Sequence, residues 1–376
     1  MQSKLPHVGT TIFTTMSKMA ADYNAINLSQ GFPNFPIDER LQELLIRNTT
    51  ENVHQYAPMA GLPVLLEQVA QLVHKRYHRT INPATELLIT AGATQGIFTS
   101  IQALVRSGDE VIIIDPAYDC YDPAIILAGG KPVHLAMRSD FTINWEELRD
   151  VISQKTRMLL INNPHNPSGR MLSATDEKAL VQLMTDYPNL LLLSDEVYEF
   201  ITFETPHRSA HDHTLLQERA IIISSFGKTF HITGWKMGYL IAPESLMKEI
   251  KKVHQFLVFS VNSLAQKTLA DYLAITDVSI LGAFYQEKRD RFRFLMKDSN
   301  FELLPCEGTY FQTARYSTIS DKDDVAFCTW LTQEIGVASI PLSGFFKDGH
   351  DYKTIRFCFA KTDETLQQAA QRLCTI

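Results

Sequence analysis

Long apolar runs are absent from this chain of 376 residues. No stretch approaches the roughly 20 consecutive apolar residues that a membrane-spanning helix needs. Residues 1–6 also lack the apolar core of a secretion signal. These two absences argue against a membrane protein and against secretion.

Closely spaced cysteine pairs are missing as well. The cysteines are odd in number and widely spread, and none belongs to a Cys-x-x-Cys motif. The five are Cys120, Cys306, Cys328, Cys358 and Cys374. This distribution is typical of reduced thiols rather than of a disulfide framework, so we expect the protein in the cytoplasm.

Positive charge is not in excess. The formal net charge is −7, and the basic residues form no polybasic run. Nonspecific binding of nucleic acid and attraction to anionic membranes both need a basic surface, so we expect neither. A hydrophobic content of 45% with 20% charged residues is typical of an ordinary folded protein.

Three common signatures of function are also lacking. No Gly-x-Gly-x-x-Gly follows a strand-like run, which argues against a NAD-dependent dehydrogenase. Ser224 and Ser225 have no evident His and Asp partners, so a serine hydrolase is poorly supported. His207, His211 and His213 lie in a polar loop without the spacing of a zinc site, and no metal site is predicted.

The chain does contain alternating strand and helix signals. Strand-like apolar runs cover residues 86–90, 111–115, 157–161, 190–194, 220–224 and 239–242. Helical spacing lies between several of them, as over residues 94–106, and Ser173 with Asp176 predicts a capping box. Continuous apolar strands separated by helices predict an α/β fold with a mostly parallel sheet covered on both faces.

The pattern changes after residue 253. Residues 253 to about 285 form a long, mostly helical stretch, and a charged helix is predicted over 286–297. We interpret the stretch as a linker helix that leads into a smaller C-terminal domain.

Lys228 is the most informative residue. It lies in the segment Ser-Ser-Phe-Gly-Lys-Thr-Phe at 224–230, directly after an apolar run. A short β-branched run that ends in small polar residues predicts a buried strand entering a loop. Taken alone, a lysine there is more often a solvated loop residue. In a partly dry cleft, however, its amine can be tuned to form a Schiff base.

Other polar residues follow neighbouring strands in the same way. Asp195 comes directly after the run 190–194, Asn166 follows the run 158–161, and Gly92 opens an amphipathic helix. In an open α/β sheet, the carboxyl ends of the strands converge on one crevice. We therefore expect these three residues to meet Lys228 in one site.

These motifs, in this order, resemble the class I pyridoxal-phosphate aminotransferases of fold type I. The resemblance runs from Asn-Leu-Ser-Gln-Gly-Phe-Pro at 27–33 to Ile-Arg-Phe at 355–357. The stretch 109–121 is especially similar to the branch that holds methionine, glutamine (type K) and kynurenine aminotransferases. The ordered Asn-Pro, Asp-Glu-Val-Tyr and Ser-x-x-Lys motifs make the resemblance highly specific.

The resemblance implies the domain organisation. A large pyridoxal-phosphate-binding domain is expected over residues 39–270, with a mostly parallel seven-stranded sheet sandwiched by helices. A smaller α+β domain is expected from residues 1–38 and 271–376. Cis peptide bonds are expected at Asp115–Pro116 and Asn166–Pro167, since only X–Pro bonds adopt the cis form at low cost.

The resemblance also implies how pyridoxal phosphate is held. Lys228 is expected to form the Schiff base, and Asp195 to pair with the pyridine nitrogen, which makes the ring an electron sink. Tyr118 is expected to stack on the ring, while Asn166 and Tyr198 are expected to bond its phenolic oxygen. The expected phosphate ligands are Gly92, Ala93, Thr94, Ser225 and Lys236, where the family often has arginine at the last position.

Substrate contacts are implied too. Arg356 is expected to bind the substrate α-carboxylate through a bidentate pair, together with the backbone of Gly31 and with Asn166. Phe13 is expected in the side-chain pocket. Tyr56 matches a family tyrosine that reaches the phosphate of the neighbouring subunit, which implies a homodimer with shared active sites.

The expected function is transfer of an amino group from an apolar, aromatic or sulfur-containing L-amino acid, methionine favoured, to a 2-oxo acid. Residues 253–266 lack the arginine that binds the distal carboxylate in dicarboxylate-specific relatives. Kynurenine or glutamine transamination with cysteine-conjugate β-lyase side activity stays open as an alternative. A noncatalytic pyridoxal-phosphate sensor is disfavoured, because no room precedes the cofactor signature for a DNA-binding domain and the chain is acidic.

Overall fold

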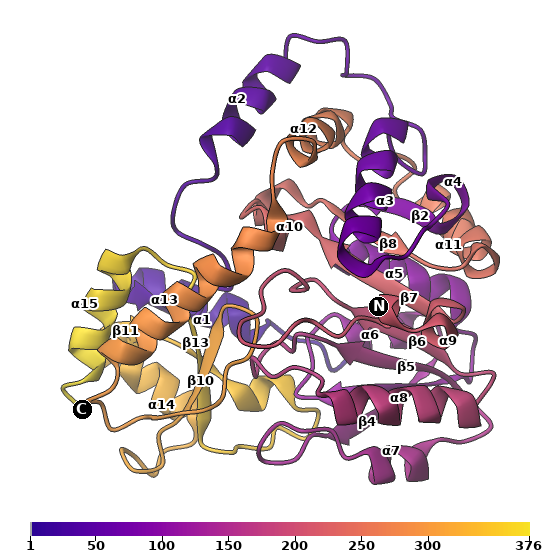
Figure 1. The fold of residues 1–376 in the computed structure, drawn as a ribbon. Coiled ribbons are helices and arrows are strands. Elements are labelled where there is room, and N and C mark those ends of the chain that lie inside the picture. The colour runs from indigo at the N-terminus through magenta and orange to yellow at the C-terminus, as the bar shows by residue number, and fades with distance from the viewer. Residues whose placement is uncertain (1) are drawn as a thin grey trace.

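The computed structural model describes residues 2–376 and centres on a seven-stranded sheet in the order β2–β8–β7–β6–β5–β3–β4 (Figure 1). The strands are β2 (Leu87–Thr90), β3 (Glu110–Asp115), β4 (Lys131–Ala136), β5 (Thr156–Asn162), β6 (Leu191–Asp195), β7 (Ala220–Ser225) and β8 (Gly238–Ile241). Only β8 is antiparallel to its neighbours, β2 and β7. The predicted mostly parallel seven-stranded sheet is confirmed.

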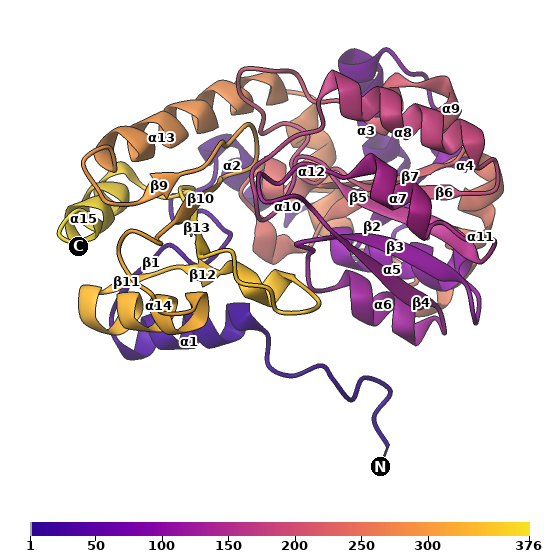
Figure 2. The same cartoon turned by 90° about the horizontal axis from the view of Figure 1, so that it is seen from below.

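Both faces of this sheet are covered, which explains the continuous apolar runs. Successive side chains of a strand point to opposite faces. Accordingly, Ile112 packs in one cluster with Leu148 and Leu180, while Ile113 packs in another with Ile97. One face carries α7 (Trp145–Val151), α8 (Ala174–Asp186) and α9 (Thr214–Gln217), and the other carries α5 (Ala93–Leu104), α6 (Tyr121–Leu127) and α11 (Glu244–Leu257). Figure 2 shows α8 and α5 on opposite sides of the strands.

A third apolar cluster covers the β2–β8 end of the sheet. There Val69 of α3 (Pro63–Tyr77) and Leu269 of α12 (Ser263–Leu273) pack with Ile89 and Ile241. The short elements nearby are α2 (Glu39–Asn48), α4 (Pro83–Glu86), α10 (Phe226–Thr229), η1 (Ala210–Asp212) and η2 (Thr233–Trp235).

The prediction of a single linker helix after residue 253 is wrong. Helix α11 ends at Leu257, α12 begins at Ser263, and α13 (Leu281–Leu295) follows the short η3 (Val278–Ile280). Phe259 adopts a left-handed φ of 67°, which stops the first helix. The side chain of Asn262 then accepts a hydrogen bond from the backbone N–H of Ala265 and so caps the next helix.

The last third of the chain forms a smaller antiparallel sheet in the order β12–β13–β10–β9. Its strands are β9 (Glu302–Leu303), β10 (Phe311–Arg315), β12 (Ile340–Pro341) and β13 (Thr354–Cys358). The N-terminal segment packs here, since β1 (Ile26–Asn27) pairs with β11 (Val337–Ala338) and α1 (Ile12–Asp22) lies against β11 and β12 (Figure 2). The remaining elements are α14 (Asp324–Trp330), η4 (Leu331–Ile335), η5 (Leu342–Phe345) and α15 (Asp363–Leu373). Two domains divided at residues 38 and 270 remain our proposal.

Several local predictions are confirmed. Ser173 and Asp176 form the reciprocal hydrogen bonds of a capping box at the start of α8. The peptide bonds Asp115–Pro116 and Asn166–Pro167 are cis, and so is Asn163–Pro164, which was not predicted. Among residues 2–376, no helix has both the length and the apolar character needed to cross a membrane.

Candidate active site

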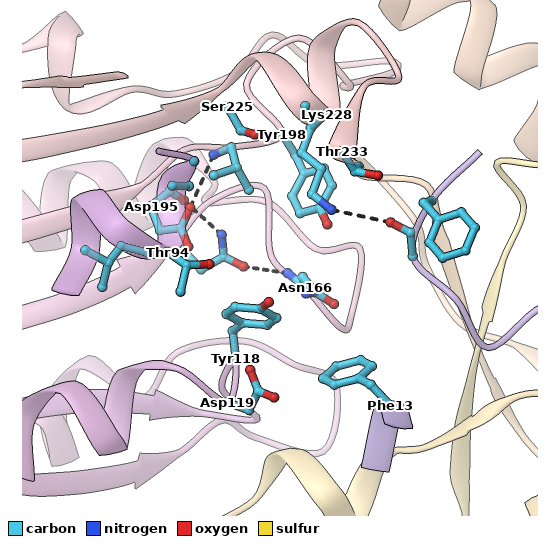
Figure 3. A pocket seen from close by; sticks show the side chains of 18 of the residues that line it. Phe13, Thr94, Tyr118, Asp119, Asn166, Asp195, Tyr198, Ser225, Lys228 and Thr233 are labelled. Atoms are coloured by element: carbon cyan, nitrogen blue, oxygen red, sulfur yellow. Dashed lines mark hydrogen bonds between the residues drawn. The ribbon is translucent and has the colours of Figure 1, made fainter. Parts of the chain in front are cut away.

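A cavity of about 400 Å³ lies at the carboxyl ends of β3, β5, β6 and β7 (Figure 3). Of the residues predicted for the site, all but one line this cavity. They are Phe13, Gly31, Gly92, Ala93, Thr94, Tyr118, Asn166, Asp195, Tyr198, Ser225, Lys228, Lys236 and Arg356. For the residues that follow strands of the large sheet, the convergence results from the parallel strands, whose carboxyl ends share one edge. Phe13, Gly31 and Arg356 instead come from α1, the loop after β1 and β13.

Lys228 stands on α10, the single helical turn that follows β7. Its Nζ donates a hydrogen bond to the carbonyl oxygen of Gly31 over 3.3 Å and lies 5.7 Å from the ring centroids of Tyr198 and Tyr310. Burial lowers the pKa of the Lys228 amine to about 8. A much larger fraction of this amine is therefore neutral, and so nucleophilic, near neutral pH than for an exposed lysine.

Asp195 ends β6 and is buried. Its Oδ2 accepts a hydrogen bond from the phenol of Tyr121 over 2.6 Å, and its Oδ1 accepts one from the backbone N–H of Val197 over 3.3 Å. Burial raises the pKa of the carboxyl to about 6, although both hydrogen bonds oppose the rise. No ion pair satisfies this carboxyl within residues 2–376, so a cationic N–H at the cavity would stabilise its ionised form.

The corner between α5, β7 and η2 is suited to an anion. Gly92 caps the start of α5 with a φ of 80°, and N–H groups of a first helical turn have no partner within the helix. A Cβ at Gly92 would lie 3.3 Å from Nζ of Lys236. Glycine therefore both permits the positive φ and leaves room for the Lys236 side chain. The helix start, Ser225 and the Lys236 ammonium together fit a phosphate dianion.

Arg356 lies in the middle of β13, between β12 and β10, and only 1% of its surface is exposed. Its Nη1 donates to Oδ1 of Asn166 over 2.7 Å, and its Nη2 donates to the carbonyl oxygen of Ser29 over 3.0 Å. The centroid of the Phe311 ring lies 3.9 Å from the guanidinium carbon. Burial lowers the pKa of Arg356 to about 10.

This guanidinium has no carboxylate partner among the described residues, and its Nε has no hydrogen-bond partner there. A buried cation without a counter-ion is costly, and a planar carboxylate is its best partner. The arrangement therefore fits the expected binding of a substrate α-carboxylate.

Asn166 is held by a second asparagine that was not predicted as a site residue. The side chain of Asn162 accepts from the backbone N–H of Asn166 over 2.7 Å and donates to the carbonyl oxygen of Asp195 over 2.8 Å. It thus ties the ends of β5 and β6 together. Its position directly after an apolar run was a usable signal.

The loop that carries Gly31 is fixed from the opposite end of the chain. The phenol of Tyr310 donates to the Gly31 carbonyl oxygen over 2.7 Å, and Nζ of Lys361 donates to the carbonyl oxygen of Phe32 over 2.8 Å. A Cβ at Gly31 would come within 2.9 Å of the Phe311 ring, so the loop has no room for a side chain. Nothing local in the sequence marks Tyr310 or Phe311 as site residues.

Two further tyrosines line the cavity on opposite sides. Figure 3 shows Tyr198 beside Lys228, and Tyr118 across the cavity near Phe13. Burial raises the pKa of both phenols well above the usual range, so both hydroxyls stay protonated and can donate hydrogen bonds. The centroids of the Phe13 and Tyr118 rings are 6.2 Å apart.

Tyr56 is the predicted residue that the structure does not bring into this cavity. Its side chain is 83% exposed and packs edge-on against Phe259, with 5.2 Å between ring centroids. Its expected contact lies in a second subunit, so its role stays a prediction.

Two histidines of the polar loop have protein partners. Nε2 of His207 lies 2.7 Å from Oε2 of the buried Glu196, and Nδ1 of His211 lies 2.9 Å from Nη1 of Arg79. Over residues 2–376, no group of three or more potential ligands is arranged to hold a metal ion. The absence of a metal from the protein stays a prediction.

Comparison with known proteins identifies the family. The family model for aminotransferase class I and II matches residues 23–373. The methionine aminotransferase of Escherichia coli is 48% identical, and the match covers 99% of this chain and 97% of that protein. A kynurenine–oxoglutarate transaminase of Dictyostelium discoideum is 33% identical, with 97% and 94% covered.

Solved structures agree. A crystal structure from Escherichia coli, reported with a methionine aminotransferase function, superposes with a TM-score of 0.98 at 47% identity, and covers 100% of this chain and 99% of that one. The fold type I architecture is therefore established for this chain. With a family-model match over residues 23–373 and a cavity suited to phosphate, ring nitrogen and carboxylate, the chain belongs to the class I and II aminotransferases, which are pyridoxal-phosphate-dependent enzymes.

Proposed function

We propose that this chain binds pyridoxal phosphate in the described cavity and transfers the amino group of methionine, or of a similar apolar or aromatic L-amino acid, to a 2-oxo acid. One observation carries the proposal. Lys228, Asp195 and Arg356 face one cavity from three separate elements, and neither buried charge of the last two has an ionic partner among residues 2–376. Cofactor and substrate would supply both partners.

We propose the following cofactor contacts, which the lining of the cavity supports. Lys228 would hold the aldehyde carbon, Asp195 the ring nitrogen and Tyr118 the ring face. Asn166 and Tyr198 would donate to the phenolic oxygen. The phosphate would lie against Gly92, Ala93, Thr94, Ser225 and Lys236.

Each protein group then has a defined task. When bound, the cofactor supplies an electron sink for the carbanion that forms at the substrate Cα. Arg356 binds the α-carboxylate and, with Asn166, fixes the orientation of the Cα–H bond. Lys228 Nζ takes the Cα proton as a base and later returns a proton as an acid. Asp195 stays ionised and holds a proton on the ring nitrogen.

The side-chain preference rests on the walls of the cavity. Phe13, Phe32 and Tyr118 line it, and residues 253–266 contain no arginine for a second carboxylate. An acidic side chain would be left unpaired there, at a cost of several kcal/mol. The likeness to the Escherichia coli methionine aminotransferase supports methionine as the preferred donor. Kynurenine or glutamine transamination, with β-lyase side activity on cysteine conjugates, is the alternative supported by the Dictyostelium relative.

A homodimer with shared sites completes the proposal. Tyr56, Phe256 and Phe259 are exposed aromatic side chains on the surface near α11 and α12, where a second copy would bury them. Tyr56 would then reach the phosphate held by the partner subunit. A cytoplasmic location is proposed from the five free cysteines.

A donor panel tests the proposal. Purified protein, saturated with pyridoxal phosphate, is assayed with methionine, phenylalanine, glutamine, kynurenine and aspartate, each against several 2-oxo acids. We expect methionine to give the highest kcat/KM and aspartate one of the lowest, and Lys228→Ala to abolish turnover with all donors. Aspartate as the best donor would refute the substrate assignment. Turnover by Lys228→Ala within about tenfold of wild type would refute the catalytic assignment.

A further inference from the structure

A buried carboxyl lies behind the wall of the cavity, outside the residues assigned so far. Glu199 follows Tyr198 in the chain and is 3% exposed. Its Oε1 accepts hydrogen bonds from the hydroxyl of Ser224 over 2.5 Å and from the phenol of Tyr239 over 3.0 Å. Its Oε2 accepts a short hydrogen bond from the phenol of Tyr77. All three donors are neutral hydroxyls.

The donors connect this carboxyl to the ends of neighbouring strands. Ser224 of β7 and Tyr239 of β8 face each other directly in the antiparallel pair, and the next pair is Ser225 with Gly238. Side chains alternate along a strand, so Ser225 faces the cavity while Ser224 faces away from it. One carboxyl therefore joins the turn after β6 to β7 and β8.

Each joined segment carries part of the cofactor cavity. Tyr198 precedes Glu199, and Ser225 follows Ser224. Gly238 abuts the start of α5: a Cβ built on it would lie 3.0 Å from the backbone nitrogen of Ala93. A shift of β8 would consequently move the helix start that faces the phosphate position.

Tyr77 differs from the other two donors. It comes from α3, and no residue of that helix lines the cavity. Its hydrogen bond to Glu199 therefore connects the carboxyl to α3, a helix outside the cavity, and not to another segment that lines the cavity. The three hydroxyls thus divide into two that lie next to cavity residues and one that does not.

The carboxyl of Glu199 is suited to holding its three hydrogen-bond donors in one fixed arrangement. Burial raises the pKa of Glu199 above its usual range, and three hydroxyl donors satisfy it without a cation. Buried polar groups that are fully hydrogen-bonded hold their neighbours in one geometry, because loss of any partner leaves an unsatisfied group.

We propose that Glu199 is a positioning residue that holds Tyr198, Ser225 and the start of α5 at fixed separations, and thereby sets the affinity for pyridoxal phosphate. The inference rests on the proposed function, since it assumes that the cofactor occupies the cavity. Glu199 itself lies behind the wall and is not a catalytic residue.

The test compares variants that remove different parts of the network. Glu199→Leu removes both acceptor oxygens at similar size. The double variant Ser224→Ala/Tyr239→Phe removes the two donors next to the cavity and leaves Glu199 and Tyr77. Tyr77→Phe removes the remaining donor and is the matched control. Glu199→Gln is the conservative variant, because its amide oxygen can accept from Ser224 and Tyr239 while its N–H donates to Tyr77.

Holoenzyme of each variant is dialysed against graded pyridoxal phosphate, and bound cofactor and thermal stability are measured. We expect Glu199→Leu and the double variant to raise the Kd for pyridoxal phosphate roughly tenfold or more. Glu199→Gln and Tyr77→Phe should stay within about twofold of wild type, even where Tyr77→Phe lowers the melting temperature. At saturating cofactor, the KM for the 2-oxo acid should stay unchanged, because none of these substitutions removes a hydrogen bond of Arg356.

Two results would overturn the inference. One is an unchanged Kd in the double variant; because this variant retains Glu199, the test holds even if Glu199→Leu does not fold. The other is a Kd that rises equally in Tyr77→Phe, which would indicate general loss of stability. If wild-type protein itself failed to bind pyridoxal phosphate, the proposed function would fall instead.

Discussion

The phenol of Tyr121 donates a hydrogen bond to Oδ2 of Asp195 over 2.6 Å, and both side chains are buried. Burial raises the pKa of the Asp195 carboxyl, and the bond from Tyr121 opposes that rise because it stabilises the ionised form. The ionised form is the one that would pair with a protonated ring nitrogen. Tyr121 therefore supports the charge state that we assign to Asp195.

Tyr121→Phe removes this donor and keeps the ring. The pKa of Asp195 should rise further, so the rate of Cα-proton removal should fall by roughly tenfold, a loss of about 1–2 kcal/mol. The loss should be greatest at acidic pH, where the carboxyl is protonated, and should shrink as pH rises. Single-turnover kinetics with Cα-deuterated methionine across a pH series measure it; an unchanged profile would contradict the role.

Arg356→Lys keeps a positive charge but loses the planar pair of donors. For amino acids, we expect kcat/KM to fall by a factor that corresponds to a loss of roughly 2–3 kcal/mol in transition-state stabilisation. Turnover of amines that lack a carboxylate should stay unchanged. Arg315→Lys on the neighbouring strand is the matched control, because the side chain of Arg315 bonds the exposed Glu302 and the carbonyl oxygen of Ser139 and does not line the cavity. Equal losses for both substrate classes would count against the carboxylate contact.

The Lys228 amine should react at lower pH than ordinary lysines. Burial lowers its pKa to about 8, whereas exposed lysines titrate near ~10.4. In protein freed of cofactor, labelling of Lys228 by trinitrobenzenesulfonate should be half-maximal near pH 8, because only the neutral amine reacts. Peptide mass spectrometry resolves the site. A midpoint close to that of exposed lysines would disprove the lowered pKa.

His134 should make stability depend on pH. Burial alone would lower its pKa, but hydrogen bonds with Asp115 and Asp122 raise it to about 9 from an ordinary value of 6.5. A raised folded-state pKa gives stability that is complete below pH 6.5 and is lost as pH rises through about 9. The difference in Tm between wild type and His134→Gln should therefore be largest near pH 6 and fade above about pH 9. A difference in Tm that does not vary with pH would show that the charged form of His134 does not contribute to stability.

Subunit complementation tests the shared site. Lys228→Ala and Tyr56→Ala chains should each be impaired alone. If Tyr56 acts in the neighbouring site, a hybrid dimer has one site with both changes and one with neither. Random mixing of equal amounts after subunit exchange should then restore about a quarter of wild-type activity. No recovery in dimers shown to be hybrid would mean that Tyr56 does not serve the partner.

Strand-end positions made much of the site predictable. Asp195, Asn166 and Lys228 each follow an apolar run, and parallel strands bring such ends to one edge. Tyr121, Tyr310 and Phe311 were not predicted, because a buried aromatic residue that lines or supports a site has the same local pattern as a core residue. Tyr310 contacts a loop 279 positions away, and no spacing rule links the two.

Two features of the fold escaped prediction for related reasons. Strand β4 begins with Lys131 and Pro132, so its apolar pattern is interrupted. The break between α11 and α12 depends on the left-handed backbone of Phe259, a conformation that usually requires glycine or asparagine. Tertiary packing decides both cases.

Arg356 is bonded to the carbonyl oxygen of Ser29, a residue 327 positions earlier in the chain. The part of the cavity that we propose binds the substrate carboxylate thus joins Ser29 to β13, the last strand in chain order. During translation, every strand of the large sheet is synthesised before β13, so a nascent chain at that stage lacks the arginine that we propose as the anchor for the substrate carboxylate. Under the proposed function, a chain truncated before β13 would keep the residues assigned to the cofactor but would lack the arginine assigned to the substrate.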